Sequence, residues 1–224
     1  MHLKTRTALR VAYLLSLALP GAAFAVSGQV VYTEGDVAWR NGTETHEAAI
    51  GDSLGPGDVI VTGAGSLAVI DLANGTTLKL KEKTTLAINS IGESTAVTLT
   101  AGGVFTTIVR KLTGRFSVQT QTAVAGVRGT EFFMAYGRTI DEKPDVWLCV
   151  NSGAVEVAIP DTGQTVVVKQ GLGINIVGGR KITSPKRYPW TRKLNWNINP
   201  GTGTVDDRTS LEQAYSDLLN QDYE

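Results

Sequence analysis

The chain has 224 residues, 42% of them hydrophobic, and balances 21 basic residues against 21 acidic ones. This length and composition can build one apolar core without disulfides, and the single cysteine, Cys149, could not form an internal disulfide in any case. A balanced charge gives no broad electrostatic surface for nucleic acid, so neither a disulfide-stapled domain nor a nucleic-acid binder is expected.

The first 25 residues have the pattern of a secretory signal peptide: basic residues, an apolar run over 11–19, and a small-residue cleavage site ending at Ala25. The apolar run is shorter than the roughly 20 residues of a membrane span, although an uncleaved anchor remains an alternative. We therefore expect a periplasmic or secreted protein with no integral span in its mature chain. Cleavage would leave 18 basic residues against 21 acidic ones.

From residue 28 onward, short alternating runs punctuated by glycine predict strands, and no helical period interrupts them before the C-terminal region. We expect an all-β domain over 26–178, built as a twisted β-sandwich or a β-solenoid-like body of many short strands. The expected strands are 29–32, 36–40, 59–61, 66–72, 77–81, 85–91, 96–100, 104–109, 114–118, 131–136, 145–150, 154–159, 165–169 and 173–177.

Turn chemistry supports this pattern. The pairs Asn41-Gly42 and Asn74-Gly75 predict tight hairpin turns with two positive φ angles, although each also begins a glycosylation acceptor sequence. The stretch 160–163 is a further turn signal. Residues 99–104 and 150–155 share an apolar strand end, a glycine-containing link and a β-branched restart, which indicates two similar hairpins.

The remaining region, 179–224, has a different composition. Residues 180–199 combine six basic side chains with aromatic ones, which suggests either a binding surface for nucleic acid or glycan, or a strap whose aromatics lie on the β body. We favour the strap. After a Gly/Pro linker over 199–203, a capping box and an apolar stripe predict a short amphipathic helix over 209–219, docked on the domain or offered to a partner. The candidate partner contacts are Trp190, Trp196, Leu211, Tyr215 and Leu218.

The most distinctive stretch is 123–132, where small residues and two glycines surround one fixed charge. Gly126 and Gly129 permit conformations or close approaches that a side chain would prevent, and the Arg128 guanidinium can donate to several backbone carbonyls. We predict a structural turn with a polar clamp at its centre. Its members are Gly126, Val127, Arg128, Gly129, Thr130 and Phe132.

This stretch resembles the Val-Arg-Gly-Thr signature of the FecR domain, a bacterial extracytoplasmic all-β module. The resemblance covers about residues 28–177 and includes a Gly-Asp-x-x-x-Thr-Gly segment, a hairpin glycine and a closing strand-Gly-strand unit; the matching residues are Gly57, Asp58, Thr62, Gly75 and Gly153. Gln121 departs from the proline that is frequent in the family. The ferric-citrate regulators of the family also carry a cytoplasmic anti-sigma segment and a transmembrane helix, which this sequence does not show, so we do not expect transmembrane signalling by this chain alone.

Catalytic patterns are scarce. His46 is the only histidine outside the leader, so neither a multi-histidine metal site nor the usual serine triad can be recognised, and no cofactor motif is present. We therefore expect no enzyme, no metal and no cofactor, but a non-catalytic binding module that contacts an envelope protein or a cell-envelope polymer. The alternative is a glycan-active or other hydrolase with carboxylates on the β face and Trp190 or Trp196 as a sugar platform. Two carboxyls about 5 to 10 Å apart in a cleft lined by these aromatics would favour the enzyme.

Overall fold

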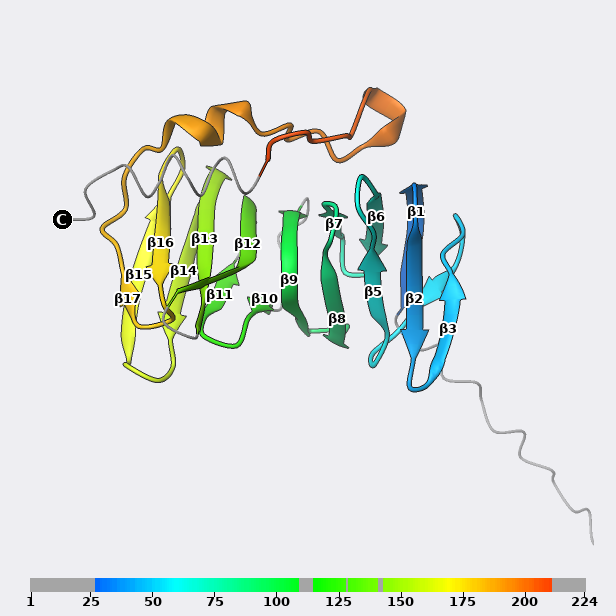
Figure 1. Cartoon of the computed structure of the whole chain (residues 1–224), viewed down its shortest axis with the longest axis horizontal. Coiled ribbons are helices and arrows are strands. Elements are labelled where there is room, and N and C mark those ends of the chain that lie inside the picture. Colours follow the sequence, from blue (N-terminus) through cyan, green and yellow to red (C-terminus); the bar gives the residue numbers. More distant parts are fainter. Residues whose placement is uncertain (1–26, 109–114, 128, 141–142, 211–224) are drawn as a thin grey trace, which may run out of the picture.

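A computed structural model describes residues 27–108, 115–127, 129–140 and 143–210. It contains strands and two short 3-10 helices and has the two-layer build of a β-sandwich, which confirms the all-β prediction. The strands stand side by side along the long axis of the molecule, and the chain advances from one end of the body to the other (Figure 1). The helix predicted over 209–219 falls almost entirely outside the described residues.

The two layers are sheets A and B. Sheet A has the spatial order β4(Ser53–Leu54), β1(Gly28–Glu34), β6(Leu67–Leu72), β7(Thr76–Leu80), the second half of β9(Ser94–Ile108), β12(Glu131–Ile140), β13(Lys143–Ser152), β16(Gly173–Val177) and β17(Lys181–Ile182). Sheet B has the order β3(Glu44–Glu47), β2(Val37–Asn41), β5(Val59–Thr62), β8(Thr85–Ser90), the first half of β9, β10(Arg115–Gln119), β11(Val124–Val127), β14(Ala154–Ile159) and β15(Gln164–Lys169).

Strand pairing distinguishes the two architectures that periodicity left open. Every pairing among the described strands is antiparallel except that of β9 with β10, whereas the coils of a solenoid would stack in parallel. The body is therefore a sandwich in which hairpins and crossings succeed one another along one axis. Its main core lies between the sheets, where Leu78, Ile88, Phe116 and Phe132 are buried.

Strand β9 belongs to both layers. Residues 96–101 pair with β8 in sheet B, and residues 102–107 pair with β12 in sheet A. The two strands expected at 96–100 and 104–109 are therefore one strand, and the first of the two expected hairpins is wrong. Gly102 has φ +81° at the crossing, where a Cβ would lie 2.3 Å from Thr84 Oγ1, so only glycine fits.

The second similar segment also crosses between the layers. Gly153 has φ +81° and joins β13 of sheet A to β14 of sheet B. The shared glycine pattern of 99–104 and 150–155 thus corresponds to two crossings rather than two hairpins. Sequence patterning detected the positions correctly but could not tell a change of layer from a reversal of direction.

The turn predictions need one correction. Gly42 and Gly75 have φ +57° and +85°, but Lys83 is the sole non-glycine residue with positive φ in the described part of the chain, so Asn41 and Asn74 do not adopt the second positive angle. Asn41 pairs with Glu44, which makes Gly42 the first central residue of a two-residue turn. Sequence patterning also missed the short strands β3, β4 and β17, and β11 within the 123–132 stretch.

Candidate functional site

A C-terminal strap, residues 183–209, lies on the outer face of sheet A. In Figure 1 its orange part runs from the β16–β17 end to the level of β6, and its red part turns back from there toward β9 and β12. It includes η1(Pro189–Lys193) and η2(Pro200–Thr202). Its side chains Tyr188, Leu194, Trp196 and Ile198 pack in one cluster with Phe105, Phe133, Ala135, Trp147 and Cys149 of the sheet. Val205, farther along, packs on Leu67 and Val69.

The register of sheet A explains why this face attracts a cover. One cross-strand row contains Val69, Lys79, Phe105, Phe133, Cys149 and Gly173 in adjacent strands. The two phenylalanine rings lie 4.6 Å apart, and Trp196 of the strap meets Phe105 edge-on at 5.3 Å. Aromatic rings in such contacts bury large apolar areas, so an uncovered sheet A would expose an extended apolar strip.

Lys79 is a cation in the middle of that row and is fully buried. Its Nζ donates to the carbonyl oxygens of Asn195 (2.5 Å) and Asn197 (2.8 Å) and lies 4.1 Å from the centroid of the Phe105 ring. Burial lowers the pKa of Lys79 to about 8, and the nearby Asp207 charge opposes that shift. The ammonium therefore binds the strap backbone directly, and the ring beneath it adds a cation–π contact.

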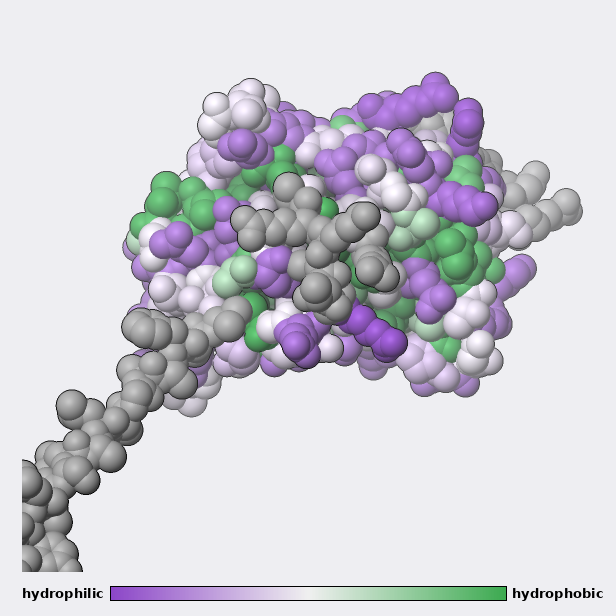
Figure 2. All heavy atoms as spheres, turned by 180° about the vertical axis from the view of Figure 1, so that it is seen from behind, coloured by the Kyte–Doolittle hydropathy of each residue, from purple (hydrophilic) through white to green (hydrophobic). Residues whose placement is uncertain are grey.

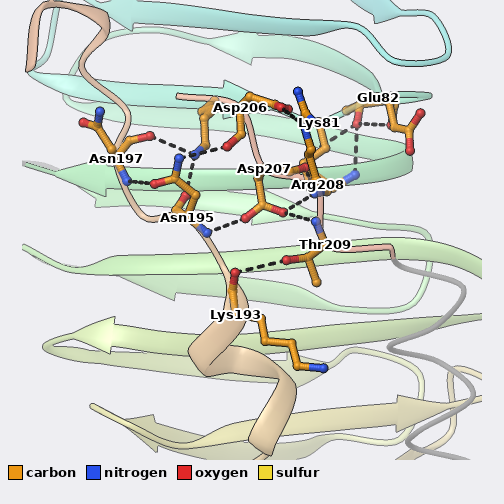
Figure 3. Close-up of polar contacts among 12 residues, drawn as sticks. Lys81, Glu82, Lys193, Asn195, Asn197, Asp206, Asp207, Arg208 and Thr209 are labelled. Atoms are coloured by element: carbon orange, nitrogen blue, oxygen red, sulfur yellow. Dashed lines mark hydrogen bonds and ion pairs between the residues drawn. The ribbon is translucent and has the colours of Figure 1, made fainter. Parts of the chain in front are cut away.

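Lys81 forms the second anchor, with Asp207 of the strap (Figure 3). The Lys81 Nζ donates to the Asp207 carboxylate and, at 2.7 Å, to the Asp207 carbonyl oxygen. The same carboxylate accepts the backbone N–H groups of Asn195 and of Thr209, the latter at 3.0 Å. The two side chains are 3% and 0% exposed. A buried ion pair of this kind is tolerated because nearly every lone pair and proton is used.

Asparagine side chains support the strap where no strand lies beside it. The side-chain oxygens of Asn195, Asn197 and Asn199 each accept the backbone N–H two residues later, at 2.9 to 3.1 Å. The Asn195 amide also donates to the carbonyls of Thr204 (3.0 Å) and Asp206 (2.8 Å), which ties the two arms of the strap together. These local bonds satisfy backbone groups that would otherwise be unpaired.

A cleft of about 430 Å³ opens where the strap leaves the end of sheet A. We call it the strap cleft. Its lining combines the polar and aromatic side chains of Asn151, Arg187, Tyr188, Thr191, Arg192 and Trp196 with Cys149, Val150, Gly171 and Leu172. No lining residue is acidic. The pair of carboxyls that would have favoured a glycan-active hydrolase is therefore not found in this aromatic cleft.

A second hollow, of about 340 Å³, lies at the other end of the strap beside Lys81. Four carboxylates line it, but its two cations are already paired: Lys81 with Asp207, and Arg208 with Asp206 at 2.7 Å. Glu82 accepts the backbone N–H of Gly65 at 2.8 Å. Across the described part of the chain, no group of three or more potential metal-ligating side chains comes together. This hollow is therefore the solvent-exposed side of the Lys81–Asp207 anchor.

The 123–132 signature forms another crossing between the sheets. Val127 ends β11 in sheet B, Gly129 has φ +64°, and Thr130 is buried just before β12 of sheet A. A Cβ on Gly153 would lie 2.8 Å from Thr130 Cγ2, so this crossing packs directly against the one at Gly153. Phe132 follows in the core. Arg128, the predicted clamp, lies outside the described residues.

Gly126 does not have the role expected of it. A Cβ there would meet only the Glu156 carbonyl oxygen, at 4.0 Å, and its φ is not positive. It instead occupies a cross-strand row of sheet B between Ser117 and Glu156. A small residue at this position leaves the outer face of sheet B flat.

The Gly57-Asp58 segment and Thr62 are structural in the described chain. Gly57 has φ +96°, and the buried Asp58 accepts the backbone N–H of Gly55 (2.7 Å) and the side-chain amide of Asn41 (2.6 Å). The Thr62 hydroxyl donates to the Lys81 carbonyl at 2.5 Å and accepts the Thr84 N–H at 2.9 Å. Thr62 therefore fixes the backbone of the lysine that anchors the strap.

The candidate partner contacts are only partly described. Trp196 is half-buried in the strap, against sheet A, and Trp190 lies in η1. Leu211, Tyr215 and Leu218 lie outside the described residues, so their predicted contacts are neither placed nor refuted. The residues that sequence reasoning missed are Lys79, Lys81 and Asp207. The alternation of asparagine with Leu194, Trp196 and Ile198 was a readable signal for an extended strap over an apolar face.

The surroundings of Cys149 and His46, two side chains that could be reactive, favour structural roles. Burial raises the pKa of the Cys149 thiol, which disfavours the thiolate that nucleophilic chemistry needs. The His46 ring stacks on Trp39 with centroids 4.4 Å apart, and its Nε2 lies 3.7 Å from Glu44 Oε2. In the described ranges, no helix is long and apolar enough to cross a membrane.

The sequence model of the FecR family (FecR protein) matches residues 58–156 of the chain. Two crystal structures of a candidate anti-sigma factor from Parabacteroides distasonis ATCC 8503 are similar at 20% identity and a TM-score of 0.49. The similarity covers 58% of this chain and only 59% of that protein. No curated protein matches the chain.

Proposed function

Because residues 58–156 of the chain form a FecR domain, we propose that the protein is a non-catalytic interaction module that acts in the periplasm or after secretion. Its partner would be another envelope protein or a cell-envelope polymer. The signal-peptide pattern of residues 1–25 supports the compartment, and the family supports a regulatory or interaction role.

The observation that carries this proposal is the open outer face of sheet B. One cross-strand row passes through nine adjacent strands and contains Thr45, Arg40, Val59, Ala87, Thr98, Gln119, Val124, Ala158 and Thr165. All are half-buried or exposed. Arg40, next to the end of the row, is its one charged member.

This face is suited to contact with an extended surface. Short side chains lose little rotamer entropy when a partner covers them, and a row with a single charge near its end has little to desolvate. Figure 2 shows hydrophobic and hydrophilic areas interspersed on the side of the molecule opposite to the view of Figure 1. Val167, which is 50% exposed on edge strand β15, extends the face to the margin of the sheet.

The experiment is site-specific photo-crosslinking in the native envelope. A photoreactive amino acid at Ala87, Gln119 or Ala158 is expected to trap a partner, and the same residue at Lys83 or Asp161, exposed positions in turns away from the row, is the control. Digestion of the adducts with protease or with polysaccharide hydrolases identifies the class of partner. Adducts from the turn positions alone, or from no position of a folded and exported protein, would refute binding through this face.

A further inference from the structure

We propose that the strap cleft is a separate binding site for an anionic saccharide, a sugar that carries a carboxylate or a phosphate. The cleft belongs to the strap and sheet A, whereas the proposed partner face is the outer face of sheet B. This inference therefore stands independently of the proposed partner face.

Two arginines give the cleft a positive charge. Arg187 and Arg192 are exposed at its wall, and neither has an ion pair or a side-chain hydrogen bond to another described residue. Lys186 lies next to them, with its Nζ 5.4 Å from the centroid of the Tyr188 ring. Glu131 reaches the cleft through its bond to Asn151 but does not line it. Guanidinium groups bind carboxylates and phosphates through paired donors, so two arginines that have no partner among the described residues favour an acidic ligand at this cleft.

The aromatic part of the cleft is rigid. The Trp196 ring is half-buried and held edge-on against Phe105, at 89° and 5.3 Å. Tyr188, only 2% exposed, forms part of the floor. A fixed indole with one accessible side offers a flat apolar surface for a sugar ring. Because folding already immobilises this ring, binding a sugar costs little additional side-chain entropy.

Oriented polar groups complete the lining. The Asn151 side-chain amide donates to Glu131 Oε2 at 2.6 Å, which fixes the orientation of its own carbonyl oxygen. The Thr191 hydroxyl donates to the Tyr188 carbonyl at 2.8 Å, so its oxygen can accept a hydrogen bond from a ligand. Fixed acceptors beside an aromatic ring match sugar hydroxyl groups, whereas an acidic peptide would offer fewer hydroxyl donors. The volume of about 430 Å³ is within the usual range for small-ligand sites.

Calorimetric titration of the mature chain tests the proposal with defined probes. Trigalacturonic acid supplies the carboxylate, glucose 1-phosphate supplies the phosphate, and maltotriose is an uncharged saccharide of matched length. We expect at least one acidic sugar to bind, with an affinity that falls as salt is raised, and maltotriose to bind at least tenfold more weakly. Binding by one acidic sugar alone supports the proposal and identifies the acid.

Variants locate the site. Arg187→Gln and Arg192→Gln should each weaken binding about tenfold or more, because each removes a charge-assisted contact. Arg180→Gln, an equally exposed arginine in the β16–β17 turn, is the matched control and should leave the affinity unchanged. Because all three side chains are exposed, thermal melting should not distinguish these variants from the wild type.

Several results would overturn the proposal. Equal binding of maltotriose would show that charge has no role, and equal loss in all three arginine variants would show non-specific attraction. Hexaglutamate that binds more tightly than both acidic sugars would assign the cleft to acidic peptides instead. Absence of binding by both acidic sugars would refute the proposed binding site. None of these outcomes depends on crosslinking through sheet B.

Discussion

Both outer faces of the sandwich are built from cross-strand rows, but the strap covers the face of sheet A and leaves the face of sheet B accessible. In sheet A, a cross-strand row of Lys79, Phe105, Phe133 and Cys149 is covered by the strap. The corresponding face of sheet B carries Ala87, Thr98 and Val124 in one row and remains accessible. The difference shows that side-chain size decides which face is covered, because large apolar side chains require burial and small ones do not.

The largest expected effect comes from breaking the cover at its buried ion pair. Asp207→Ala leaves the Lys81 ammonium without its carboxylate, which should lower the free energy of unfolding by about 3 to 5 kcal/mol. Asp206→Ala is the matched control, because solvent screens its pair with the 92%-exposed Arg208 and its loss should have little effect on stability. Urea denaturation compares the two variants, and equal losses would contradict the assignment of Asp207 as the anchor.

A smaller effect is expected when the covered face loses an aromatic ring. Phe105→Leu keeps an apolar side chain but removes the contacts with Phe133, Trp196 and the Lys79 ammonium. The expected cost is about 2 kcal/mol, from ring contacts and one cation–π contact. Thermal melts that show no change would indicate that the strap does not depend on these rings.

The covered face also predicts a pH dependence. Burial lowers the pKa of Lys79 from 10.5 to about 8, so between these values the unfolded chain binds more protons than the folded one. The contribution of Lys79 to the unfolding free energy should therefore rise with pH in this window, by at most about 1.4 kcal/mol per pH unit.

The measurement for this prediction is the difference in unfolding free energy between wild type and Lys79→Met from pH 7 to 9.5. Groups common to both proteins, such as Cys149, cancel in the difference. A difference that stays constant, or that falls with pH, would show that the buried ammonium keeps an ordinary or raised pKa.

The smallest effect is expected on the open face. Thr98→Ala removes a side chain that bonds only Asn89, at 2.7 Å on the surface, and should change stability by no more than about 0.5 kcal/mol. Thr98 and Phe105 lie on the same strand, so denaturation of the two variants compares the faces directly. A loss at Thr98 as large as that at Phe105 would show that sheet B also has an essential cover.

Much of the fold could be predicted from sequence because its signals are local. Alternation located most strands, and glycines marked the crossings at Gly102 and Gly153. The burial of Lys79 could not be predicted, because Thr77-Leu78-Lys79-Leu80-Lys81 alternates like a strand with one hydrated face. The group that covers Lys79 is Asn195, 116 residues later. Local patterns contain no information about a contact of that range.

The position of Asp207 in the chain has a consequence for the order of assembly. The carboxylate that neutralises Lys81 follows the lysine by 126 residues, near the end of the described chain. Until that residue has been synthesised and delivered, Lys81 must keep its hydration shell, and the aromatic row beside it must face solvent. The strap, which follows every described strand in the chain, therefore completes the burial of the outer face of sheet A. Before the strap docks, the domain differs from its final form in the hydration of that face rather than in the path of its strands.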